Sequence, residues 1–182
     1  MSAAQGLRAY AYIDGAYLRS EGAKVATPFP NPKMIVNWAM QHVHSIGSVK
    51  LRRTSYYDAE PPDEASIPAL EGYWQFVEKQ FDTDLRFGEV RGKPKRQKGV
   101  DVLLAVDMLS ASSRDLFDVA ILVTGDADFV PLVREVRRYG ITAVVAGVGS
   151  TTAKELQTAA DRFVPLDSVT CPALTQEPFK PV

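Results

Sequence analysis

Two aspartates separated by one residue follow a short apolar run. Asp126 and Asp128 come just after Val119–Val123, and Gly125 allows the chain to turn between the run and the aspartates. An uninterrupted apolar run of this length is typical of a strand buried on both faces of a parallel sheet. One such aspartate often only caps the next helix, whose first turn Pro131 fits. Two carboxylates this close repel each other, and a hard divalent cation such as Mg²⁺, which prefers oxygen ligands, relieves the repulsion.

Two further aspartates occupy comparable places. Asp14 directly follows a strand predicted over 7–13, although a simple turn explains one aspartate there equally well. Asp101 falls in the first turn of a helix predicted from 99 to about 112, where the helix dipole favours a carboxylate. Asp107 lies more than one and a half turns further along that helix, so it cannot share a ligand with Asp101, and we expect it to be structural.

Basic and small residues supply candidate phosphate contacts. Five basic residues fall between 91 and 98, and a solvated charged loop is their usual explanation. Because this segment runs directly into Asp101, we interpret its basic residues as phosphate contacts; they are Lys93, Lys95, Arg96 and Lys98. Ser150, in a loop of small residues, is a weaker candidate for the same role.

The remaining pattern predicts the elements that must position these groups. Strands are expected over 7–13, 49–57, 85–91, 119–123, 141–146 and 162–166. Helices are expected over 33–45, 67–81, 99–112, from just after Asp128 to 139, and over 153–160. This alternation indicates an α/β fold with a parallel sheet covered on both sides. If the first and fourth strands are neighbours, their aspartates face one crevice. We also expect the helix over 99–112 to be well buried and the acidic loop 58–64 to be solvated surface.

Composition bounds the class of protein. The chain has 182 residues, 46% of them hydrophobic and 24% charged, with a formal charge of −1, so any basic surface must be local. The only cysteine is Cys171, which fits a reducing cytosol. Neither a signal peptide nor an apolar run near the ~20 residues of a membrane span is found, so a cytoplasmic protein is expected. The last residues, 171–182, contain three prolines and are expected to form a loosely ordered tail.

Three motifs together resemble those of one family. They are Tyr12-Ile13-Asp14-Gly15, the segment 98–109 (KGVDVLLAVDML) and the segment 121–132 (ILVTGDADFVPL). The chain resembles the NYN domain family, the LabA-like branch of the PIN-like ribonuclease superfamily, over about residues 8–167. The resemblance implies a PIN-like three-layer α/β/α sandwich with a mainly parallel central sheet, formed by a single domain over 1–170.

The resemblance also implies Mg²⁺- or Mn²⁺-dependent hydrolysis of RNA phosphodiester bonds. By motif position, the metal-binding and catalytic residues would be Asp14, Asp101, Asp126 and Asp128. The family's first motif usually reads Asp-Gly-x-Asn, and here Tyr17 stands in the place of the asparagine. This departure keeps open an alternative, a non-catalytic regulatory module that binds RNA or a protein partner and retains the acidic pocket.

A third hypothesis is a phosphatase of the haloacid-dehalogenase-like class. Such enzymes carry the nucleophilic aspartate in an Asp-x-Asp pair directly after the first strand. Here the residue two positions beyond Asp14 is Ala16, which argues against this class.

Overall fold

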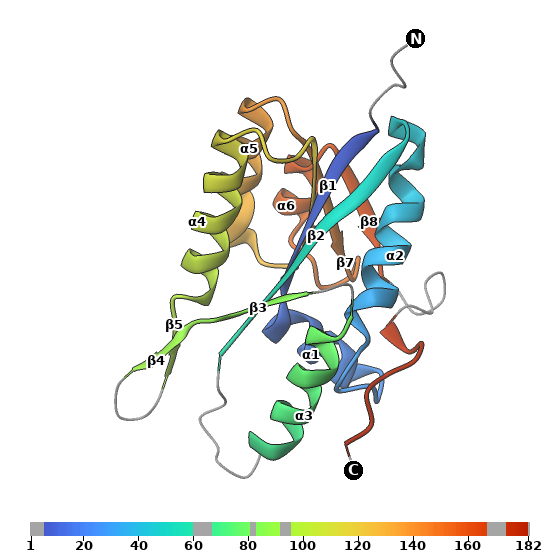
Figure 1. Cartoon of the computed structure of the whole chain (residues 1–182), viewed down its shortest axis with the longest axis vertical. Coiled ribbons are helices and arrows are strands. Elements are labelled where there is room, and N and C mark those ends of the chain that lie inside the picture. The colour runs from blue at the N-terminus through green and yellow to red at the C-terminus, as the bar shows by residue number, and fades with distance from the viewer. Residues whose placement is uncertain (1–5, 60–66, 81–82, 92–95, 167–173, 182) are drawn as a thin grey trace.

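A six-stranded sheet forms the centre of the protein (Figure 1). The computed structural model describes residues 6–59, 67–80, 83–91, 96–166 and 174–181. The strand order is β3-β2-β1-β6-β7-β8, and every pairing between neighbours is parallel. These strands are β1 (Leu7–Asp14), β2 (Val49–Asp58), β3 (Asp84–Phe87), β6 (Val119–Val123), β7 (Thr142–Gly147) and β8 (Arg162–Pro165). The predicted α/β/α sandwich with a parallel sheet is confirmed.

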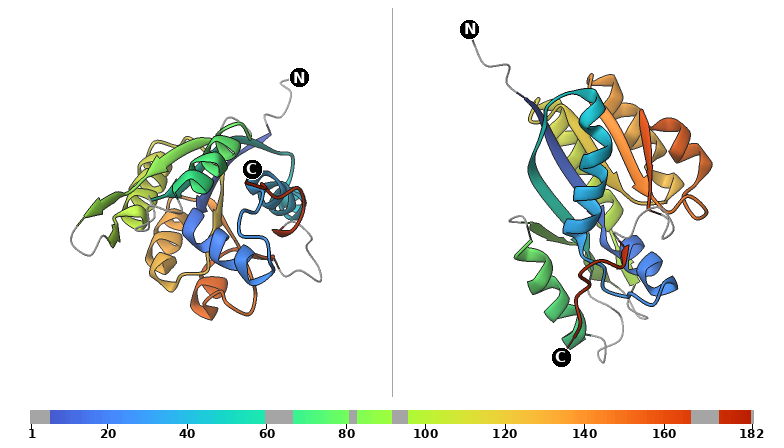
Figure 2. Two further views of the ribbon diagram at one scale, coloured as in Figure 1. Left: turned by 90° about the horizontal axis from the view of Figure 1, so that it is seen from below. Right: turned by 90° about the vertical axis from the view of Figure 1, so that its right-hand side faces the viewer.

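Helices cover both faces of this sheet (Figure 2). One face packs against α1 (Gly15–Lys24), α2 (Pro32–Val43) and α3 (Ile67–Glu78). The other packs against α4 (Val100–Ser113), α5 (Val130–Arg138) and α6 (Lys154–Ala159). Two 3₁₀ turns, η1 (His44–Ile46) and η3 (Ala127–Phe129), complete the helical elements of the described residues. Of the helices in this part of the chain, none has the length and apolar character needed to cross a membrane.

Two elements differ from the prediction. Helix α1 was not expected, because it carries few apolar residues at helical spacing; its start is fixed instead by Asp14, whose side chain accepts a hydrogen bond from the backbone N–H of Tyr17. The single strand expected over 85–91 is interrupted at Gly88. Its second half, β4 (Glu89–Arg91), pairs antiparallel with β5 (Arg96–Lys98), so the basic segment belongs to a hairpin that leads into α4.

The strand order places the reversal of the chain between β1 and β6. From β1 the chain runs outward through β2 and β3, and from β6 it runs the other way through β7 and β8. Ile13 lies opposite Val123 in the register, so Asp14 and Thr124 emerge together at the carboxyl edge. In open parallel sheets, this reversal point is where a crevice opens for ligands.

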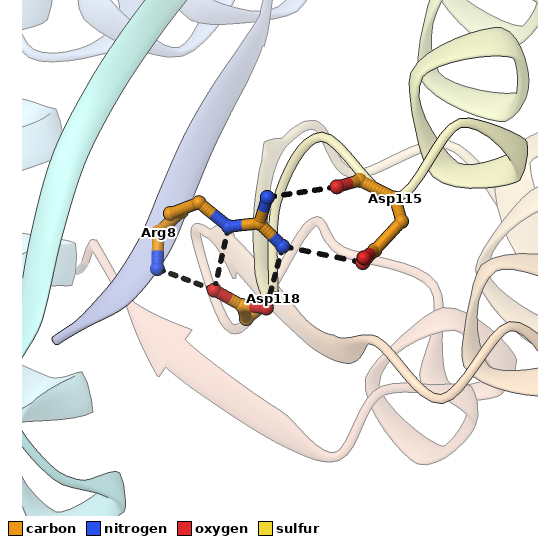
Figure 3. Close-up of polar contacts among 3 residues, drawn as sticks. All are labelled: Arg8, Asp115 and Asp118. Carbon is orange, nitrogen blue, oxygen red and sulfur yellow. Dashed lines mark hydrogen bonds and ion pairs between the residues drawn. The ribbon is translucent and has the colours of Figure 1, made fainter. Parts of the chain in front are cut away.

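An ion-pair cluster joins β1 to β6 at the opposite, amino edge (Figure 3). Asp118 accepts from the Arg8 backbone N–H at 2.6 Å and from its guanidinium Nε and Nη2 at 3.0 and 2.9 Å. The same guanidinium donates to the carbonyl of Asp115 at 2.8 Å. These hydrogen bonds hold the pKa of Asp118 below its usual range. The cluster therefore fixes the two strands that carry candidate site residues at their other ends.

Helix α4 is only partly buried, contrary to the expectation from its apolar composition. Leu104 and Met108 are fully buried against the sheet. Val102 and Val106, on the other side of the helix, are 65% and 55% exposed. The outer side of α4 has no covering element in the described chain, so apolar composition overstated its burial.

The described part of the C-terminal segment, 174–181, contacts the core. Leu174 is buried with the residues on the α1–α3 side of the sheet. Phe179 packs against the rings of Phe29, Tyr73 and Phe76, and its backbone N–H donates to the Phe29 carbonyl at 3.0 Å. This portion of the expected loose tail therefore has specific packing partners.

The two sides of α4 predict different responses to the same kind of substitution. Leu104→Ala removes a fully buried side chain and is expected to lower the free energy of unfolding by about 2–5 kcal/mol. Val106→Ala, on the exposed side, is the matched control and should cost less than about 1 kcal/mol. Urea denaturation followed by circular dichroism measures both. Equal costs would show that α4 does not present these faces as described.

Candidate active site

An open pocket of about 380 Å³ lies at the carboxyl edge of the sheet, beside the reversal point. Three of the four predicted aspartates line it, each from a different part of the chain: Asp14 ends β1, Asp101 lies in the first turn of α4, and Asp126 follows β6. The remaining lining residues are Ala16, Tyr17, Ser20, Asp58, Gly99 and Val100. Folding thus brings to one hollow carboxylates from positions as far apart in the sequence as 14 and 126.

Asp14 is the buried member of the group, with 8% of its surface exposed. Its Oδ1 accepts from the backbone N–H of Tyr17 at 3.0 Å, and its Oδ2 accepts from the hydroxyl of Thr124 at 2.9 Å. Burial is the main cause that raises the pKa of Asp14, and the charges of Asp101 and Asp126 raise it further, while the two hydrogen bonds oppose the change. The carboxylate is therefore fixed in place yet carries unbalanced negative charge.

Asp101 is exposed and is not held by a hydrogen bond or an ion pair within the described residues. Gly99 precedes α4 in the left-handed conformation, with φ of 83°, which a glycine adopts at no steric cost. This geometry starts α4 at the pocket and places Asp101 in its first turn. Neighbouring protein atoms remove part of the water around the exposed Asp101 carboxylate, which raises its pKa, and the negative charges of Asp126 and Asp128 add to the rise.

Asp126 and Asp128 have different surroundings. Oδ1 of Asp126 accepts from the backbone N–H of Asp128 at 2.9 Å, so Asp126 caps η3 as well as lining the pocket. Asp128 does not line the acidic pocket; it borders, with Asp101, the neighbouring groove between α4 and α5. The structure therefore places three of the predicted aspartates in one pocket and the fourth at its rim.

Tyr17 fills the space above two glycines at the strand ends. A Cβ on Gly125 would lie 2.6 Å from Cε2 of Tyr17, and one on Gly147 would lie 3.0 Å from the tyrosine hydroxyl. That hydroxyl accepts from the backbone N–H of Val148 at 2.8 Å and lies 3.3 Å from Oγ1 of Thr152. Gly125 is thus required because the ring approaches its backbone, and not because the turn needs a positive φ.

One pocket residue was missed by the sequence interpretation. Asp58, expected in a solvated loop, is 1% exposed. It forms an ion pair with Arg19 and accepts from Trp74 Nε1 at 2.8 Å and from the backbone N–H of Ala59 at 2.9 Å. Its position directly after β2 was the available signal, because β2 neighbours β1 and ends at the same edge. Unlike Asp14, it is compensated by a cation.

Asp107 has the structural role that its position on α4 predicted. It accepts from the hydroxyl of Tyr57 at 3.1 Å and pairs with the Arg86 guanidinium at 3.0 and 3.2 Å. These contacts tie α4 to β2 and β3, away from the acidic pocket.

Of the predicted phosphate contacts, the structure describes the side chain of Ser150 alone. Lys93 and Lys95 lie outside the described residues. Arg96 and Lys98 belong to β5, which precedes Gly99 at the pocket, but their side chains also lie outside the described part. Ser150 is exposed in the loop after β7 and does not line the acidic pocket. These residues stay predictions.

The donor set of the pocket suits a hard divalent cation, because it offers carboxylate oxygens and neither a histidine nor a cysteine lines it. The raised pKa values of Asp14 and Asp101 point the same way, since their charge is not neutralised by any cation of the described chain. As arranged, however, no group of three or more His, Cys, Asp or Glu side chains among the described residues is close enough to hold a metal ion. Asp101 and Asp126 are exposed, so both would have to turn towards Asp14 when a cation binds.

The repulsion in the pocket predicts that Asp101→Asn raises the melting temperature near neutral pH in EDTA. A raised pKa means that the folded state holds the proton more tightly than the unfolded state, so the wild type loses stability as pH rises from the ordinary value of 3.8 through the raised one. The gain from Asp101→Asn should therefore vanish below that ordinary value, and Mg²⁺ should stabilise the wild type more than the variant. Thermal unfolding with and without Mg²⁺ measures both. A lower melting temperature in EDTA at neutral pH would instead show that the carboxylate stabilises the first turn of α4.

One solved structure gives an independent view of the fold. A protein of unknown function from Vibrio parahaemolyticus superposes with a TM-score of 0.68, covering 92% of this chain and 97% of its own, at 19% sequence identity. At this identity, the likeness establishes a shared fold. The search of curated proteins returned no match.

The NYN domain family matches residues 8–167, which include Asp14, Asp101, Asp126 and Asp128. The match spans the whole central sheet, from β1 to β8. With its PIN-like sandwich and the acidic pocket at the reversal point, the chain belongs to the NYN domain family.

Proposed function

We propose that this protein is a Mg²⁺- or Mn²⁺-dependent ribonuclease that hydrolyses RNA phosphodiester bonds in the acidic pocket. The observation that carries the proposal is the convergence of Asp14, Asp101 and Asp126 on one hollow, where no cation of the described residues balances them. Membership of the NYN domain family supports a nuclease-type domain. A magnesium ion would balance the carboxylate charges and, through its remaining positive charge, attract an RNA phosphate.

The proposal gives each residue a separate task. Asp14, immobilised by Tyr17 and Thr124, would be the fixed ligand, while Asp126 and Asp101 would turn in to complete the cation site. A bound Mg²⁺ supplies an activated water and withdraws charge from the phosphate. Asp128, at the rim beside Asp101, would hold or orient a water on the side of the α4–α5 groove. Arg96 and Lys98, in the strand that leads to Gly99, would contact the RNA backbone.

Asp126→Asn is expected to lower the rate of Mg²⁺-dependent cleavage of single-stranded RNA by at least about 100-fold, because it removes a ligand charge from the proposed site. The fold should persist, since the asparagine oxygen can still accept the N–H of Asp128. Cleavage of a fluorescently labelled RNA measures the rate, and circular dichroism verifies the fold.

The matched control is Asp115→Asn, the same substitution at the opposite edge of the sheet. Asp115 has φ of 52°, a conformation that asparagine tolerates, and its side chain is 89% exposed. This variant should cleave RNA at the wild-type rate. Undiminished cleavage by Asp126→Asn would remove the assignment of the pocket.

A second function is favoured by the state of the pocket itself. Tyr17 replaces the family's usual asparagine and is locked by Val148, and the described carboxylates are not gathered closely enough for a metal. Both observations suit a non-catalytic module that binds RNA or a regulatory protein and keeps the pocket as a relic. Calorimetric titration with Mn²⁺, followed by the cleavage assay, separates the two functions. Metal binding without RNA cleavage, or no metal binding, supports the non-catalytic module. Metal binding together with RNA cleavage that Asp126→Asn abolishes supports the nuclease.

A further inference from the structure

A second pocket lies along α4, on the side of the sheet that faces this helix. It has a volume of about 160 Å³ and is separate from the acidic pocket, with which it shares no lining residue. Its floor consists of side chains from β1 and β2, and one wall is a single side of α4, from Asp107 to Arg114 at its end. Arg86 of β3 completes the lining beside α4. We call it the tyrosine–arginine pocket, after its lining residues Tyr12, Tyr57, Arg53, Arg86 and Arg114.

The floor contains a largely buried tyrosine, Tyr12, whose hydroxyl has no hydrogen-bond partner within the described structure. Tyr12 is 3% exposed, and its ring packs against Tyr57 and Phe117. Tyr12 lines the pocket, and its hydroxyl makes no hydrogen bond with the described residues, although this atom is not fully shielded from solvent. Burial raises the pKa of the Tyr12 phenol, so the hydroxyl stays protonated and is available as a donor. A hydroxyl that has no protein partner and faces a pocket can donate to water or to a ligand that enters the pocket.

The walls add positive charge. Three arginines line the pocket against one carboxylate, that of Asp107. Arg86 pairs with Asp107, and Arg53 pairs with Asp84 at 2.6 Å, but each guanidinium has five donors and such pairs leave some unused. Arg114 is exposed, donates to the Ser110 carbonyl at 3.2 Å and has no carboxylate partner within the described residues. The pocket therefore offers both unspent N–H donors and net positive charge.

The position of the pocket relates it to the acidic site. Both open along α4, the acidic pocket at its first turn and the tyrosine–arginine pocket between Asp107 and its end. At 1.5 Å per residue, the separation along the helix is roughly 10–20 Å, the span of a few nucleotides of an extended RNA strand. One strand can therefore reach both sites.

We propose that the tyrosine–arginine pocket binds a phosphodiester of the RNA chain a few nucleotides from the bond in the acidic pocket. Arg114 and the free donors of Arg53 contact the phosphate oxygens, and the Tyr12 hydroxyl donates a hydrogen bond from the floor. Such a contact fixes the register of the strand along α4 without reading its bases. This inference rests on the proposed function, because it takes RNA as the ligand of the domain.

The test measures binding of a labelled single-stranded oligouridylate by fluorescence anisotropy, with Mg²⁺, in the Asp126→Asn background so that the RNA stays intact. Arg114→Gln and Tyr12→Phe are each expected to raise Kd at least about threefold, whatever the RNA sequence. Arg114→Gln should also reduce the slope of log Kd against log salt by about 0.7, the value for one phosphate contact on a single strand. Tyr12→Phe should leave the melting temperature unchanged, since no hydrogen bond of the described residues is lost.

Arg134→Gln is the matched control, because it removes one exposed arginine charge from α5, outside this pocket. It should change Kd by less than about twofold. Effects of Arg114→Gln and Tyr12→Phe no larger than this, or a parent protein that binds no RNA, would overturn the inference. Full competition by millimolar inorganic phosphate would assign the pocket to free phosphate instead and would also overturn it. If the Asp126→Asn protein still cleaves RNA, the proposed nuclease site is contradicted. The comparison of Kd values, made without Mg²⁺ so that the RNA stays intact, then still tests this pocket.

Discussion

The hydrogen bond from Thr124 to Asp14 joins the two strand ends on which the candidate site depends. It spans the reversal point between β1 and β6, with 2.9 Å between Thr124 Oγ1 and Asp14 Oδ2, and it holds this buried carboxylate at the carboxyl edge of the sheet. The cluster of Arg8, Asp115 and Asp118 fixes the same two strands at the other edge. With both ends fixed, the position of Asp14 is set by the sheet rather than by a mobile loop.

The contrast between Asp58 and Asp14 separates structural from functional carboxylates in this pocket. Asp58 is as deeply buried, but Arg19 and Trp74 satisfy it, so it needs nothing from outside. Among the described residues, Asp14 receives hydrogen bonds only from neutral donors, and Asp101 adds negative charge nearby. Uncompensated repulsion of this kind lowers stability, and a bound cation removes it. The opposite holds in the tyrosine–arginine pocket, where Arg114 has no carboxylate partner among the residues that the structure describes, so an anion would balance its charge.

Much of the fold followed from local pattern, and the misses have physical causes. The apolar run at β6 and the strand–aspartate order of Asp14 and Asp126 predicted the parallel sheet and its acidic edge. Helix α1 was missed because a single cap, and not an apolar stripe, defines it. The burial of Asp58 and the exposure of Val102 depend on which elements pack beside them, information that composition does not carry. Tyr17 was recognised as a substitution, but its contact with the backbone of Gly125 required the tertiary structure.

Binding of a divalent cation among the aspartates at the reversal point is what the proposed function requires. A crystal of the protein soaked in Mn²⁺ and measured for anomalous scattering tests it most directly. We expect one strong peak in the acidic pocket, within coordination distance of carboxylate oxygens of Asp14 and Asp126, with Asp101 turned towards the ion. No peak in this pocket, or a manganese ion bound elsewhere with these side chains unmoved, would contradict it.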